Sequence, residues 1–83
     1  MSQRILVGNL PPDITDEEIE QVARDGGAQA PAVTLNREGD AEKVAAVLEL
    51  PNIDRAAADR IAARINGSRY RGRTLSAYVP LFL

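Results

Sequence analysis

Two helix-forming segments, at about residues 16–25 and 54–65, constrain the fold of this chain most, because each presents an apolar stripe that must be covered. Thr15 and Glu18 form a capping box in front of the first segment. Gly26-Gly27 ends that segment, and an asparagine–glycine pair ends the second. Both helices are short, so the rest of the chain must supply the surface on which they pack.

Runs of apolar and β-branched residues around these helices predict four β-strands. They lie at about residues 4–8, 32–35, 43–50 and 73–79. The third run is rich in alanine and in isolation also allows a helix, but the breakers on both sides, including Pro51, favour a strand. In the fourth run, Leu75, Ala77 and Val79 alternate with polar residues and are predicted to form its buried face.

The order of these elements is strand, helix, strand, strand, helix, strand, without repeats or linkers. This order predicts an α+β, ferredoxin-like fold, in which two helices cover one face of a four-stranded antiparallel sheet. The other face of the sheet is predicted to be open. We expect one domain over residues 1–83, with a core from about 4 to 79 and a C-terminal tail at 80–83.

The composition excludes several chemistries. The chain of 83 residues has no cysteine and no histidine, which removes disulfides, thiolate or Ser-His catalysis and the common zinc and copper sites. It also has no glycine-rich phosphate loop. We therefore expect no enzyme, no cofactor and no metal. No apolar run is long enough for a bilayer and no signal-peptide pattern is present, so we expect no membrane partner and a cytoplasmic protein, or a nuclear one in a eukaryote.

Charge is distributed unevenly along the chain. The formal net charge is −2, which argues against strong binding of nucleic acid by charge alone. The first third is crowded with acidic residues, namely Asp13, Asp16, Glu17, Glu18 and Glu20. The last third carries a cluster of arginines, namely Arg64, Arg69, Arg71 and Arg73. Either this cluster contacts phosphates, or it is a solvated surface balanced by the acidic first helix.

Two strand segments carry a resemblance to a known family. Residues 5–10, Ile-Leu-Val-Gly-Asn-Leu, resemble the six-residue ribonucleoprotein motif of an RNA recognition motif (RRM), and residues 43–50 lie where its eight-residue motif belongs. The helix boundaries are also similar, at Leu10-Pro11-Pro12 before Thr15, and at Ile65-Asn66-Gly67 before Tyr70. The resemblance covers about residues 4–79. It implies the RRM fold and a non-catalytic RNA-binding module.

The chain departs from that family where RRM domains stack bases on aromatic rings. The corresponding positions are Leu6, Ala45 and Val47, which cannot stack as rings do. Lys43 matches the basic residue that opens the eight-residue motif and is predicted to contact a phosphate. Tyr78 is out of phase with the buried positions of the last strand, which makes it the best stacking candidate. The chain thus resembles a divergent RRM without the stacking aromatics.

These considerations predict a weak or atypical module for single-stranded RNA. The predicted RNA-binding residues are Leu6, Asn9, Lys43, Ala45, Val47, Arg69, Arg71, Arg73 and Tyr78. The alternative is a protein-interaction module that uses either the aliphatic sheet face or the acidic first helix. Some RRM-like domains that bind peptides combine an acidic first helix with an Arg-x-Phe motif, to which Ser68-Arg69-Tyr70 corresponds only in part. The tail at 80–83 is also available to cover the sheet face, including Tyr78.

Overall fold

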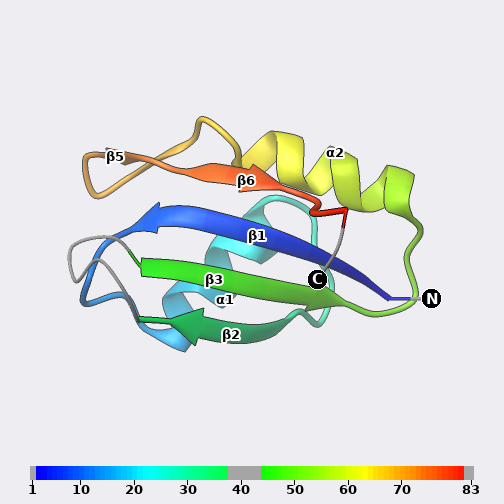
Figure 1. Cartoon of the computed structure of the whole chain (residues 1–83), viewed down its shortest axis with the longest axis horizontal. Coiled ribbons are helices and arrows are strands. Elements are labelled where there is room, and N and C mark those ends of the chain that lie inside the picture. The colour runs from blue at the N-terminus through cyan, green and yellow to red at the C-terminus, as the bar shows by residue number, and fades with distance from the viewer. Residues whose placement is uncertain (1, 38–43, 82–83) are drawn as a thin grey trace.

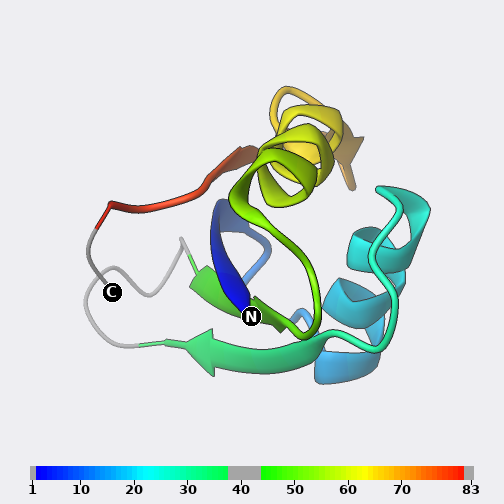
Figure 2. The same ribbon diagram turned by 90° about the vertical axis from the view of Figure 1, so that its right-hand side faces the viewer.

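The sheet and helices follow the predicted order. The computed structural model describes residues 2–37 and 44–81. Its main sheet contains β1 (Gln3–Leu10), β2 (Ala32–Asn36), β3 (Val44–Leu50) and β6 (Ser76–Tyr78), in the antiparallel order β2-β3-β1-β6. The helices α1 (Asp16–Asp25) and α2 (Arg55–Ile65) cover one face of this sheet and leave the other open (Figures 1 and 2). The predicted α+β fold is confirmed.

Local hydrogen bonds explain where the helices begin. At α1 the Thr15 hydroxyl accepts from the Glu18 amide at 3.2 Å, and the Glu18 carboxylate accepts from the Thr15 amide at 3.1 Å. The predicted capping box is therefore present. At α2 the Asp54 carboxylate accepts from the Ala57 amide at 2.8 Å. Each cap satisfies amides that have no partner within the helix.

The core lies between the sheet and the helices, and its buried side chains among the described residues are aliphatic. Alternate residues of the central strands point into it, among them Ile5 and Val7 of β1 and Leu48 of β3, which have no exposed surface. The strand interpretation of residues 43–50 is confirmed over 44–50, and Lys43 lies outside the described residues. Small residues such as Ala58 and Ala62 on the buried face of α2 let this helix approach the sheet closely.

The predicted last strand, 73–79, is wrong as a single element. Residues Arg73–Thr74 form β5, which pairs with β4 (Arg69–Tyr70) in a separate hairpin, and only Ser76–Tyr78 joins the main sheet. The break falls at Leu75, whose amide donates to the Ser68 carbonyl at 2.8 Å and whose carbonyl accepts from the Gly67 amide at 2.8 Å. Because both bonds go to the segment after α2, Leu75 is not paired with β1.

Backbone conformation explains the extra hairpin. Arg71 and Gly72, the two residues between β4 and β5, have φ angles of 48° and 79°. Two consecutive positive φ angles are characteristic of the tight type I′ turn, whose twist matches that of the strands that it joins. The four strands predicted from the sequence do not include residues 69–70, so β4 was missed.

Candidate nucleic-acid interface

The open face of the sheet has a continuous central row of side chains. Direct strand pairing places Leu6 between Val47 on β3 and Tyr78 on β6, and Val47 in turn pairs with Thr34 on β2. On β1 and β3 the flanking positions are buried beneath the sheet, so the side chains of this row point away from the helices. Figure 1 looks onto this face, with α1 behind the strands. Leu6 and Val47 are half-buried, whereas Tyr78 is 54% exposed.

A second row lies toward the end of β1. Ala45 pairs with Asn36, and Gly8 pairs with Ser76. A Cβ atom at Gly8 would lie 2.8 Å from the Ser76 hydroxyl oxygen, so the strands approach too closely there for a larger residue without movement of that hydroxyl. Ala45 faces the irregularity between Val7 and Leu10 of β1. Gly8, Ala45 and Ser76 therefore give this row mostly small side chains.

Asn9 occupies that irregularity with a left-handed backbone, at φ 63°. Its side-chain amide donates to the Thr74 carbonyl at 3.0 Å. The bond ties the end of β1 to the last residue of β5. Asn9 thus has a structural role beside its predicted contact with RNA, which the structure does not test.

The described part of the tail leaves the sheet face accessible. Beyond β6 the chain runs past the sheet edge toward the open side, as the red segment in Figure 2 shows. Leu81 is 77% exposed, and Tyr78 keeps more than half of its surface in solvent. Residues 82 and 83, to which the prediction of a covering tail also applies, lie outside the described residues.

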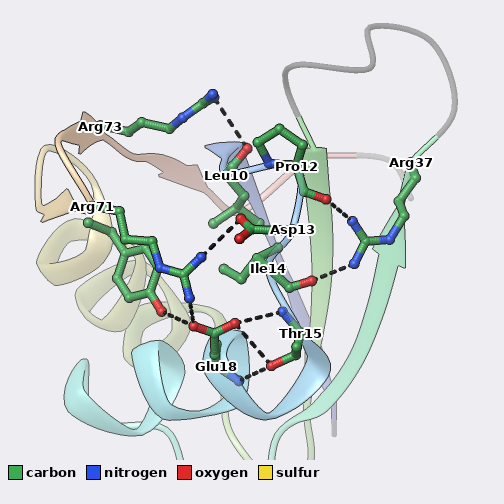
Figure 3. A network of polar contacts seen from close by, with 10 residues as sticks. Leu10, Pro12, Asp13, Ile14, Thr15, Glu18, Arg37, Arg71 and Arg73 are labelled. Atoms are coloured by element: carbon green, nitrogen blue, oxygen red, sulfur yellow. Dashed lines mark hydrogen bonds and ion pairs between the residues drawn. The ribbon is translucent and has the colours of Figure 1, made fainter.

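The arginines of the predicted cluster contact different partners, and Figure 3 shows Arg71 and Arg73 with theirs. Arg71 forms ion pairs with Asp13, at 3.0 Å, and with Glu18, and its guanidinium lies 5.3 Å from the centre of the Tyr70 ring. Tyr70 donates its hydroxyl to the same Glu18 carboxylate at 2.9 Å. The charge of Arg71 is therefore balanced by acidic residues at and just before the first helix, which is one of the two alternatives stated for the arginine cluster. Its contact with RNA stays a prediction.

Arg69, Arg73 and Arg37 each donate to main-chain carbonyls. Arg69 donates to the Gly72 carbonyl at 3.2 Å, and Arg73 donates to the Leu10 carbonyl at 3.4 Å. Arg37, which the sequence analysis did not select, donates to the carbonyls of Pro12 and Ile14. In Figure 3, Arg37, Arg71 and Arg73 surround the segment that joins β1 to α1. Arg37 follows β2, whereas Arg71 and Arg73 belong to the β4–β5 hairpin. Both places are far in sequence from the segment that the arginines contact, so spacing in the sequence gave no signal of this arrangement.

A groove on the helical side is the other candidate surface. It has a volume of about 300 Å³ and lies between α1 and Tyr70, with Val22 in its apolar lining and Glu17 and Asp25 among its acidic residues. A neighbouring cavity of about 190 Å³ shares Val22, Asp25 and Tyr70 and extends to Arg64. Tyr70 thus packs beside α1 and the end of α2, as expected.

An open antiparallel sheet with two helices behind it and a ring on its exposed face defines an α+β, RRM-like domain. No protein-family model and no curated protein matches the sequence. Solved structures match the fold, and the RRM3 domain of Mip6 has a TM-score of 0.77 at 20% identity, over 93% of this chain and 90% of that chain. The predicted resemblance to RRM domains is confirmed for the fold.

Two further matches are structures with RNA. The Rna15 RRM with bound RNA (GU) has a TM-score of 0.72 at 17% identity, over 94% of this chain and 82% of that chain. The SR1 RRM1 domain of Plasmodium falciparum, in complex with ACAUCA RNA, has a TM-score of 0.63 at 22% identity, over 96% and 85% of the two chains. Like the match to Mip6, these two matches show the fold of the chain.

Within the described residues, no helix is long and apolar enough to cross a membrane.

Proposed function

We propose that this domain binds single-stranded RNA weakly, across the open face of its sheet. One observation carries the proposal: Tyr78 is 54% exposed and lies directly beside Leu6, in the row that continues to Val47. A ring on an otherwise aliphatic face offers a stacking position for one base. The RNA-bound structures of Rna15 and SR1 support the proposal, because their sheets share the fold of this chain.

Weak binding is proposed because the central strands carry no rings at the stacking positions. A stacked base contributes about 1–3 kcal/mol, or about 5- to 150-fold in affinity. Leu6, Ala45 and Val47 offer apolar contact without that stacking, so Tyr78 must supply most of it. Lys43, Asn9, Arg69, Arg71 and Arg73 are retained as proposed polar contacts with RNA. The domain acts as a binding module without a cofactor, not as an enzyme.

Titration of the ¹⁵N-labelled domain with a short single-stranded RNA at low salt tests the proposal. We expect amide shifts that concentrate on β1, β3 and β6. Tyr78→Ala should weaken binding by about 5- to 150-fold, since the stacking position is lost. Tyr78→Phe should bind nearly as the wild type, because it keeps the ring. An absence of shifts on the sheet face would exclude this function.

Protein binding is the second candidate function, favoured by the groove beside α1. Its apolar lining at Val22 and Tyr70 and its acidic residues Glu17 and Asp25 suit a basic peptide with one large apolar side chain. Such a peptide should shift the amides of α1 and β4, and Glu17→Lys should weaken its binding. Shifts confined to the sheet face would instead favour RNA, or a protein partner that covers the aliphatic centre formed by Leu6, Ala45 and Val47.

A further inference from the structure

A polar cavity lies at the end of the sheet where β1 begins. Its volume is about 290 Å³, and its lining includes Arg4, Arg55, Ser2, Gln3 and the segment Val79–Leu81. Three parts of the chain meet there: the start of β1, the first residue of α2 and the segment after β6. Figure 2 looks toward this end of the molecule. No carboxylate lines this cavity among the described residues, so its charged lining consists of the two guanidinium groups.

The contacts of the two arginines hold them at this position. Arg4 lies 3.2 Å from the Glu49 carboxylate through its Nε atom. Arg55 donates from Nη2 to the Val79 carbonyl at 3.2 Å, while its Nε atom lies 3.8 Å from the Asp59 carboxylate. A guanidinium has five N–H donors in a planar fork, so it can serve several acceptors at once. About half of each arginine side chain is exposed.

This cavity adjoins the proposed stacking position. Arg4 is the outward-facing residue of β1 that precedes Leu6, and Leu6 pairs directly with Tyr78. Among the described residues, Tyr78 and Leu81 are the exposed large hydrophobic side chains, at 54% and 77%. An aromatic ring, an apolar side chain and two guanidinium groups therefore occupy one continuous stretch of surface. A nucleotide has the matching groups, namely a base to stack and a phosphate to pair.

We propose that Arg4 and Arg55 form a binding site for a backbone phosphate of single-stranded RNA where the strand leaves the sheet beside Tyr78. This inference rests on the proposed RNA-binding function and adds to it a path off the sheet, along residues 79–81. Arg4 and Arg55 each pair with one carboxylate, whereas Arg71 pairs with two.

The test compares two arginines of the same helix. Arg55→Gln removes a charge that lines the cavity, and Arg60→Gln removes the same charge from an exposed position of α2 outside it. For single strands, each phosphate contact contributes about 0.7 to the slope of log K against log salt concentration. Arg55→Gln should therefore reduce the loss of affinity between about 50 and about 200 mM salt by about 2.6-fold. Arg60→Gln should leave that loss unchanged.

A second measurement locates the phosphate. The probes are RNAs in which a single phosphate linkage is replaced by an uncharged methylphosphonate. At one position along the RNA, this replacement should weaken binding to the wild type. The same replacement should have no further effect on the double variant Arg4→Gln/Arg55→Gln. If Tyr78→Ala weakens binding while Arg55→Gln and Arg60→Gln behave alike, the phosphate site is wrong and the RNA-binding function stands. If the wild type binds no RNA at low salt, both are wrong. Amide spectra of the variants verify that each remains folded.

Discussion

Replacing Glu18 with alanine removes four contacts of its carboxylate at once, one of them a hydrogen bond from the Thr15 hydroxyl at 3.2 Å. The carboxylate accepts from the Thr15 amide at 3.1 Å, accepts from the Tyr70 hydroxyl at 2.9 Å and pairs with Arg71. Its side chain is 28% exposed and that of Arg71 is 41% exposed, so solvent screens the ion pair and its share is at most about 1 kcal/mol. The capping bond and the bond to Tyr70 contribute about 0.5–1.5 kcal/mol each.

These terms sum to a loss of about 2 kcal/mol in the free energy of unfolding, or about 8–16 °C in Tm for a domain of this size. Glu18→Gln separates the terms, because glutamine keeps the acceptor of a capping box and loses the charge. It should lose about 1 kcal/mol or less. Arg71→Gln is the partner for a double-mutant cycle, which should give a coupling energy of at most about 1 kcal/mol with Glu18→Gln.

Urea unfolding followed by far-UV circular dichroism measures these differences, and an unchanged m value would show that the unfolding reaction is the same. The reasoning predicts a clear order, with Glu18→Ala less stable than Glu18→Gln and Glu18→Gln less stable than the wild type. If glutamine and alanine destabilise equally, the capping bond contributes nothing measurable. If alanine costs less than about 0.5 kcal/mol, the whole network contributes nothing measurable.

Two further substitutions test the core and the hairpin. Leu48→Ala opens a cavity at a side chain with no exposed surface and should lower the free energy of unfolding by about 2–5 kcal/mol. Leu81→Ala is the control, because that side chain is 77% exposed, and its free energy of unfolding should stay within about 0.5 kcal/mol of the wild-type value. Equal unfolding midpoints in urea would contradict the placement of these two residues. Gly72→Ala should cost about 1–2 kcal/mol, because φ is 79° there and no atom lies within 4 Å of an added Cβ, so backbone strain is the whole effect. Thermal unfolding measures it, and a Tm equal to that of the wild type would refute the left-handed turn.

Sequence reasoning reached the fold because its signals were local. Helix caps, glycine stops and alternation of apolar residues each depend on a few neighbouring positions, and together they gave the element order. The break at Leu75 was missed because it depends on hydrogen bonds to Gly67 and Ser68, which only the folded chain brings near. The hairpin turn was missed because Arg71 is an unusual residue for a positive φ angle.

The candidate site was predictable to the extent that it depends on strand alternation. The same alternation that buries Ala77 places Tyr78 on the open face, beside the position of Leu6. The arginines were less predictable, because their partners are far away in the sequence. Arg71 pairs with Asp13, and Arg4 lines a cavity with Arg55. No local pattern indicates such pairs, and composition alone gives only their net charge.

The hydrogen bonds of Arg37 affect how much the amino-acid sequence between β1 and α1 can vary. Its guanidinium bonds to the main-chain oxygens of Pro12 and Ile14, not to their side chains. Every amino acid supplies a main-chain oxygen, so the exposed positions of this segment can change while both bonds persist. Arg37 itself cannot be exchanged in this way, because lysine lacks the planar fork that reaches two acceptors. Related sequences should therefore keep an arginine at the end of β2 even where the segment that it holds has diverged.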